Sequence, residues 1–198
     1  MLETRHAARR TMALNVPQPT TRFGAAAEVM IRPLAGDARF SLRLDAATAK
    51  AVGIAAGFNL DIPFNSWSGS RDRFVARLGP NEWLLVGPDS DAEVIAGQVQ
   101  DALAEQFHVL VDIGHRNVAI EVSGRKAAEV LNSGCPLDLA DSAFSAGTAT
   151  RTLLGKAEIL LMRLDDTPSY RVECWRSFAS YVHEFLLDAA REFDLSDA

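Results

Sequence analysis

Cysteines and clusters of basic residues are scarce in this sequence, and each scarcity argues against a class of protein. Only two cysteines occur in 198 residues, Cys135 and Cys174, and they form no CxxC or CxxH pattern. We therefore expect a reduced, cytoplasmic protein without a structural zinc site. The 20 lysines and arginines are outnumbered by 26 acidic residues, which gives a net charge of -6. Because phosphate contacts need lysine and arginine patches, nucleic-acid binding is not expected.

Long apolar runs and nucleotide-binding motifs are also missing. No run of eighteen apolar residues occurs, so we expect no transmembrane helix and no membrane partner. The basic N-terminus is not followed by the apolar stretch of a secretory signal. The P-loop, GxGxxG, GxSxG and HExxH patterns are absent. His6 lies in the N-terminal segment, and we place His183 on the exposed side of the last helix. Neither histidine has a further metal ligand at a suitable spacing.

Residues 1–25 differ from the rest of the chain in composition. The segment is basic at Arg9 and Arg10 and contains Pro17 and Pro19. We expect a flexible arm, and its arginines suit a strap across a partner because guanidinium groups bind bidentately at interfaces. The alternative is a disordered tail.

Residues 26–198 contain an internal repeat, with halves at about 26–107 and 108–198. Each half begins with a strand in which apolar and polar residues alternate, continues with a short helix and a Leu-Asp motif, and ends with a hairpin and an amphipathic helix. The predicted elements of the first half are strand 39–44, helix 46–56, hairpin 73–86 and helix 91–105. Those of the second half are strand 117–122, helix 125–132, hairpin 157–174 and helix 177–192.

The repeat predicts an α+β fold built from a duplicated strand–helix–hairpin–helix unit. Mixed or antiparallel sheets should carry helices packed on them. Neither half alone can bury a sheet face and two amphipathic helices well, whereas two halves packed together can. The alternative is an α+β chain whose halves resemble one another by accident.

Residues 112–117 form a predicted turn between two strands that carries several polar side chains. Asp112, His115 and Arg116 on one tight turn suit anion binding or acid–base chemistry. The interpretation that we favour is structural: a hairpin turn in which Gly114 supplies an unusual φ and Asp112 bonds to the backbone. No catalytic, cofactor-binding or metal-binding residue is predicted.

The three tryptophans suggest packing and partner contacts. Trp83 and Trp175 lie at strand ends, where packing in the core or at the seam between halves is expected. Trp67 lies in the polar stretch 65–70, predicted as a loop. An exposed tryptophan on a loop is typical of an interface anchor, and folding back onto the domain is the alternative. Together with the turn and the arm, the predicted interface residues are Trp67, His115, Arg116, Arg9 and Arg10.

Several segments in order resemble the gamma subunits of heterotetrameric sarcosine oxidases. They are residues 78–86, 112–124, 131–139, 150–152 and 172–178. The resemblance implies a non-catalytic subunit of a complex that oxidatively demethylates sarcosine to glycine, forming hydrogen peroxide and methylene-tetrahydrofolate. It implies an alpha subunit with NAD and a folate site, a beta subunit with FAD and covalently held FMN, and a small delta subunit with zinc. The gamma subunit would carry no cofactor and would chiefly contact beta.

A wider similarity links residues 112–131 to the aminomethyltransferase domain of the glycine-cleavage T-protein, whose fold is also a duplicated α+β unit. This similarity implies an alternative function, a stand-alone folate-binding aminomethyltransferase-like protein. The Lys-Gly-Cys-Tyr-x-Gly-Gln motif of folate-dependent iron–sulfur relatives is missing, and the nearest stretch is residues 154–158. A pocket between the halves, lined by a carboxylate and aromatic rings, would distinguish the two functions.

Overall fold

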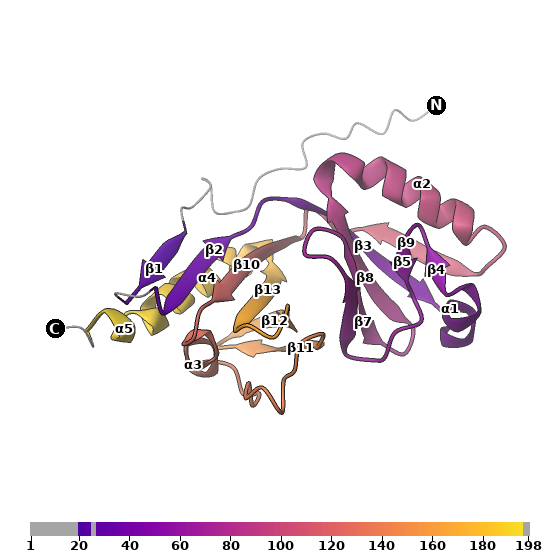
Figure 1. Ribbon diagram of the computed structural model, residues 1–198. Coiled ribbons are helices and arrows are strands. Elements are labelled where there is room, and N and C mark those ends of the chain that lie inside the picture. Colours follow the sequence, from indigo (N-terminus) through magenta and orange to yellow (C-terminus); the bar gives the residue numbers. More distant parts are fainter. Residues whose placement is uncertain (1–19, 25–26, 196–198) are drawn as a thin grey trace.

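Two antiparallel sheets form the centre of the molecule in the computed structural model, which describes residues 20–24 and 27–195 (Figure 1). The strand order of the first sheet is β6 (Ser66–Gly69), β7 (Phe74–Gly79), β8 (Glu82–Pro88), β3 (Asp37–Leu44), β9 (His108–Asp112). The strand order of the second sheet is β11 (Ala149–Leu154), β12 (Ala157–Arg163), β13 (Ser169–Trp175), β10 (Asn117–Ser123), β2 (Val29–Pro33), β1 (Thr21–Phe23). A small separate ladder joins β4 (Ile54–Ala55) to β5 (Phe58–Asn59).

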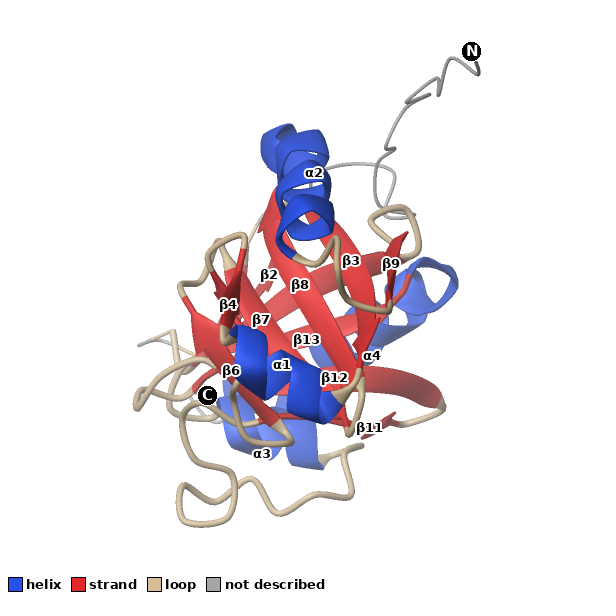
Figure 2. Ribbon diagram, turned by 90° about the vertical axis from the view of Figure 1, so that its right-hand side faces the viewer, coloured by secondary structure: helices blue, strands red, loops and turns tan. Residues whose placement is uncertain are grey.

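The helices lie on the outer faces of the two sheets, so the molecule has four layers (Figure 2). The helices on the first sheet are α1 (Ala46–Val52) and α2 (Ala92–Ala102). Those on the second sheet are α3 (Ala127–Asn132) and α4 (Ala179–Ala190), followed by the short α5 (Glu192–Leu195). Single 3-10 turns at Asp89–Asp91 and Arg176–Phe178 lead into α2 and α4. No helix in the described ranges has the length and apolar character that a membrane span requires.

Strand alternation separates two kinds of core. In β8, Trp83 and Leu85 face the helices, whereas Leu84 and Val86 face the other sheet. The helix-facing cores are largely apolar, although Arg163 on β12 and His183 on α4 are also buried there. The layer between the sheets is different: its apolar cluster comes mainly from β7, β8, β11 and β12, and the inward-facing residues of β13 include Arg171 and Glu173.

The two sheets have matching strand orders, and each takes an edge strand from the other half of the chain. The orders β6-β7-β8-β3-β9 and β11-β12-β13-β10-β2 correspond position by position. However, β2 comes just before β3 in the sequence and pairs with β10, whereas β9 comes just before β10 and pairs with β3. The predicted boundary at 107/108 therefore divides the chain but not the sheets, because residues 108–112 complete the first sheet and residues 29–33 extend the second.

The first helix is shorter than predicted. At its start the Asp45 carboxylate accepts hydrogen bonds from the N–H groups of Ala47 and Thr48 at 2.9 and 3.1 Å. The helix ends at Val52 rather than near residue 56, because Gly53 adopts a φ of 68° and stops it.

The predicted arm also ends earlier than expected. Residues 21–23 form β1, which pairs with β2 at the edge of the second sheet. Phe23 is buried in the core beneath α4. The Gly24 N–H then donates to the Asp194 carboxylate at 2.9 Å, so this part of the predicted arm is tied to the C-terminal end of the fold.

His183 is buried on α4, not exposed as predicted. The side chain is 6% exposed, and its Nε2 has no hydrogen-bond partner in the part of the chain that the structure describes. Burial lowers the pKa of His183, and the charge of Glu184 offsets only part of this effect. The imidazole is therefore held neutral in the folded protein.

Burial of a neutral His183 predicts an acid-sensitive stability. In the unfolded chain the imidazole takes up a proton near its ordinary pKa of about 6.5, whereas the folded state resists protonation. Stability should thus be complete above that pH and fall as pH drops from it through the folded pKa. Urea unfolding of the wild type and His183→Leu at pH 7.5 and 5.5 measures this. We expect the wild type to lose more stability than the variant; equal losses would contradict the assignment.

Candidate functional site

A buried ionic cluster joins the inner faces of the two sheets. Its centre is the Glu173 carboxylate on β13, which accepts hydrogen bonds from Arg39 Nε on β3 at 2.8 Å and from Arg171 Nε at 2.8 Å. Arg171 also reaches back to the Asp37 carboxylate on β3 at 2.5 Å. Arg39 and Glu173 are each only 1% exposed. The halves of the chain are therefore connected by paired charges in a place that water does not reach.

The charges in this cluster are fixed by one another. Burial alone raises the pKa of Glu173, but the guanidinium groups of Arg39 and Arg171 outweigh burial, so the pKa lies below its usual range. A carboxylate held ionised between two guanidinium groups is a poor general acid or base near neutral pH. The arrangement thus suits holding the sheets in register rather than transferring protons.

A second ionic link joins the halves in the layer between the two sheets. Arg151 on β11 donates to Glu82 on β8 through both terminal nitrogens, at 3.0 and 2.5 Å. Arg43 on β3 lies 3.2 Å from the same carboxylate. The hydrogen bonds from Arg151 lower the pKa of Glu82 and outweigh the opposing effect of burial. This bidentate geometry is the strong form of a charged hydrogen bond.

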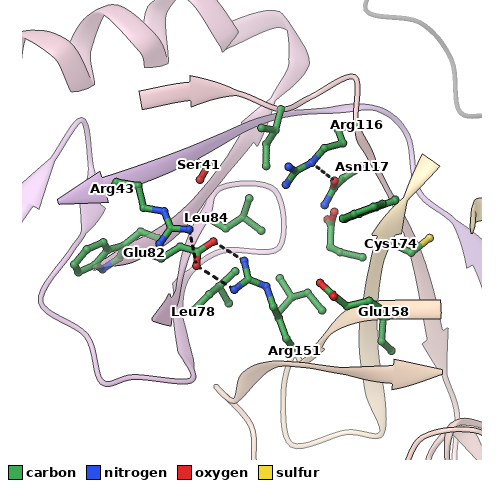
Figure 3. A pocket seen from close by; sticks show the side chains of 16 residues that line it. Ser41, Arg43, Leu78, Glu82, Leu84, Arg116, Asn117, Arg151, Glu158 and Cys174 are labelled. Atoms are coloured by element: carbon green, nitrogen blue, oxygen red, sulfur yellow. Dashed lines mark hydrogen bonds and ion pairs between the residues drawn. The ribbon is translucent and has the colours of Figure 1, made fainter. Parts of the chain in front are cut away.

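A cleft of about 470 Å³ opens between the sheets beside this link (Figure 3). Its walls come from both halves and combine charged and aromatic side chains. The charged and aromatic lining residues are Arg43, Glu82, Trp83, Arg116, Arg151, Glu158, Glu173 and Trp175. Trp175 is 47% exposed, which differs from the predicted packing role, and the Arg116 guanidinium lies 6.0 Å from its ring. Trp83 is fully buried, as expected, with its Nε1 donating to the carbonyl of Leu60 at 3.0 Å.

The thiol in the cleft wall is unsuited to nucleophilic chemistry. Cys174 is buried, and burial together with the neighbouring Glu173 charge raises its pKa to about 12. The thiolate is therefore not populated near neutral pH. Cys135 is also a free, buried thiol. Within the described ranges no group of three or more histidine, cysteine, aspartate or glutamate residues is arranged to hold a metal ion.

Trp67 lies at the seam between the halves, not in an open loop. It belongs to β6, and its indole Nε1 donates to the carbonyl of Arg163 in the second half at 2.8 Å. The ring packs edge-on against Phe74 at 5.9 Å. The loop interpretation was wrong because residues 66–69 pair with β7, and the second half covers part of the indole. Contact of Trp67 with a partner stays a prediction.

The remaining predicted interface residues have different outcomes. His115 and Arg116 are exposed on the turn between β9 and β10, and Arg116 reaches the cleft. That turn carries the chain from one sheet to the other and closes no hairpin. Asp112 accepts a hydrogen bond from the Gly114 N–H at 2.9 Å, as the structural interpretation expects, but Gly114 has no positive φ. Arg9 and Arg10 lie outside the described residues.

The buried arginines and Glu173 were not predicted as functional residues. The alternation of the predicted strands already contained a signal for them. In β3 the apolar face is formed by Phe40, Leu42 and Leu44, so Arg39 and Arg43 share the opposite face. From the sequence alone that face is interpreted as solvent-exposed, because the second sheet that covers it is not evident from local patterns.

Comparison with known proteins places this geometry in a family. The sequence profile described as "Sarcosine oxidase, gamma subunit family" matches residues 36–192, which include both sheets except for β1 and β2. The chain belongs to the sarcosine oxidase gamma subunit family. A gamma subunit from Corynebacterium sp. (strain P-1) is 31% identical over 168 residues, covering 85% of this chain and 77% of the relative. One from Arthrobacter sp. is 27% identical over 188 residues, covering 93% and 91%.

Solved structures show the same architecture. A chain of the heterotetrameric sarcosine oxidase from Corynebacterium sp. U-96, in complex with pyrrole 2-carboxylate, superposes with a TM-score of 0.77 at 24% identity. The match covers 94% of this chain and 97% of that one. Aminomethyltransferase T of the glycine cleavage system from Bartonella henselae gives a TM-score of 0.61 at 12% identity. This chain spans about half of that enzyme, with 50% covered, so the gamma subunit family shares part of its fold.

The ionic cluster predicts a large stability loss when its central carboxylate is neutralised. Glu173→Gln leaves Arg39 and Arg171 buried with too little negative charge, and breaking a buried pair in this way costs about 3–5 kcal/mol. Glu158→Gln is the matched control, because Glu158 is an exposed glutamate on the neighbouring strand of the same cleft. Urea unfolding should give a much lower free energy of unfolding for Glu173→Gln only. A loss below about 1 kcal/mol would show that the cluster is dispensable.

Proposed function

We propose that this chain is the non-catalytic gamma subunit of a heterotetrameric sarcosine oxidase and acts as an assembly partner of its flavin-bearing beta subunit. The observation that carries the proposal is the family match over residues 36–192. In this proposal FAD, FMN, NAD and zinc belong to the alpha, beta and delta subunits. The complex converts sarcosine to glycine in the cytoplasm, with hydrogen peroxide and methylene-tetrahydrofolate as products.

The state of the ionisable groups in the cleft supports a structural role. Glu82 is held by Arg151 and Arg43, and Glu173 is held by Arg39 and Arg171. The contacts of Arg43, Arg151 and Arg39 bridge strands, and those of Arg151 and Arg39 also join the two halves. Arg171 and Glu173 lie on the same strand, β13. A catalytic step that changed the charge of either glutamate would weaken the link between the sheets.

The proposal extends to the origin of the fold. We infer that the halves descend from one duplicated unit, since the strand orders of the two sheets correspond. In this scheme β3 corresponds to β10, β8 to β13, and α2 to α4. Separate least-squares superposition of the halves, with each edge strand assigned to the sheet it joins, tests the inference.

A second candidate function has one specific observation in its favour. The cleft between the halves is lined by carboxylates and by the half-exposed ring of Trp175, the combination that a pterin ring requires. The candidate is a stand-alone folate-binding, aminomethyltransferase-like protein. Against it, two of the three carboxylates already form ion pairs with arginines.

Calorimetric titration of the isolated chain with tetrahydrofolate separates the two functions. We expect no heat of binding at micromolar ligand, because a pterin that used Glu82 or Glu173 would have to displace Arg151 or Arg39, and the remaining carboxylate, Glu158, is solvent-exposed. Trp175→Ala is the companion variant if heat is observed. Micromolar binding that this substitution abolishes would replace the assembly role with the folate-binding one.

The assembly role predicts that the chain co-purifies with the other subunits and that residues 1–19 contribute to affinity. Tagged full-length chain and a chain lacking residues 1–19 are co-expressed with the alpha, beta and delta subunits. The deletion stops before β1, so the fold and its thermal midpoint should be unchanged. We expect full recovery of flavin-bearing complex with the full-length chain and lower recovery with the truncated chain. Equal recovery would remove the arm from the interface.

A further inference from the structure

The edge strand β9 has hydrogen-bonding groups directed away from the sheet. The Ile113 N–H donates to the Arg39 carbonyl at 2.8 Å. In the antiparallel register with β3, the main-chain N–H and C=O groups of residues 109, 111 and 113 therefore point toward β3. The main-chain groups of His108 and Leu110 must then face the opposite, outer side. No described strand lies along that outer side, because β9 ends the sheet.

The same strand exposes an unusual amount of apolar surface. Phe107 is 93% exposed, Val109 is 46% exposed and Val111 is 48% exposed. Val109 and Val111 stand opposite Arg43 and Ser41 in the register with β3, so their side chains point to the layer between the sheets. The second sheet does not reach them there. Natural edge strands are usually protected by charges, prolines or bulges, and β9 has apolar side chains at these positions instead.

The corresponding edge of the second sheet is covered. β2 occupies the position in that sheet that β9 occupies in the first, and β1 pairs along its outer side through Arg22↔Met30 and its neighbours. In the second sheet a sixth strand, β1, therefore lies beside β2. In the first sheet no strand within the described ranges lies at the matching place beside β9.

Charged groups beside β9 indicate what kind of segment fits. Arg43 shares a surface hollow with Phe107 and Val109, and its side chain is 51% exposed. Arg116 lies four residues after the end of β9 and lines the adjoining cleft. Within the described residues Arg116 bonds to Asn117 and lies near the Trp175 ring but forms no ion pair, and its charge acts on Glu82 only from a longer distance. The apolar strip is thus followed by a guanidinium group that has no carboxylate in ion-pair contact.

We propose that β9 receives an extended segment of another sarcosine oxidase subunit as a sixth strand of the first sheet. The segment has apolar side chains at alternate positions, which cover Val109 and Val111, and an acidic side chain that pairs with Arg116. Main-chain hydrogen bonds to His108 and Leu110 supply affinity, as in other cases of strand addition. The proposal rests on the assembly role proposed above and adds the surface and the binding mode.

Amide hydrogen exchange and two variants test the proposal in the assembled complex. Exchange at the outward-facing amides of His108 and Leu110 should slow by about tenfold or more on assembly. Val111→Asp places a charge on the covered strip and should weaken binding by about tenfold. His108→Pro removes one outward-facing N–H at the first residue of an edge strand, where proline is tolerated, so it should weaken assembly without unfolding the chain.

The matched control is Leu153→Asp, which makes the same change on β11, the edge strand of the other sheet, at a side chain that is 50% exposed. It should leave assembly unchanged. Unaltered exchange at β9, or equal effects of Val111→Asp and Leu153→Asp, would overturn the docking surface while leaving the assembly role standing. Failure of the wild-type chain to co-purify would overturn both proposals. If the isolated chain dimerises with protection of the same amides, the occupant is a second copy and the proposal is wrong.

Discussion

The position of Glu173 between two guanidinium groups constrains the whole molecule. Its carboxylate lies on the inner face of the second sheet, and Arg39 approaches it from the first, so the two sheets can stack in only one register without leaving a buried charge unpaired. The apolar cluster beside it, which includes Phe74, Leu84 and Met162, supplies hydrophobic contact with much less directional specificity. The charged centre therefore determines where the seam lies, and the cleft opens where the sheets diverge beyond it.

The cleft belongs to a fold that is shared in part with an enzyme. Part of aminomethyltransferase T has the same architecture, and a cavity between halves is a natural consequence of stacking two twisted sheets. In this chain Arg151 and Arg43 hold the Glu82 carboxylate at the cleft wall, and Cys174 is kept protonated by burial. Exposed apolar side chains lie in and beside the cleft: Trp175 in its lining and the valines of β9.

Sequence patterns were sufficient to find several strands and the last helix, although not to show that β10 and β12 are buried on both faces. Residues 39–44 and 117–122 alternate apolar and polar side chains, residues 157–164 precede a turn, and the apolar stripe that includes Val182 and Leu186 predicts α4. The predictions were wrong or missing where long-range contacts decide the structure. Trp67 is partly covered by the second half, and His183 faces the core because α4 packs along the second sheet. No local pattern contains that information.

The exchange of β2 and β9 has a consequence for biosynthesis. β2 leaves the ribosome early, but its neighbour β10 begins only at residue 117, so β2 must wait while more than 80 residues are translated. Closing so long a loop is slow compared with forming the local hairpin β7–β8. The first sheet, in turn, is complete only after residue 112. Neither half therefore makes a finished domain by itself, and a nascent or truncated chain would present unpaired strand edges that favour aggregation.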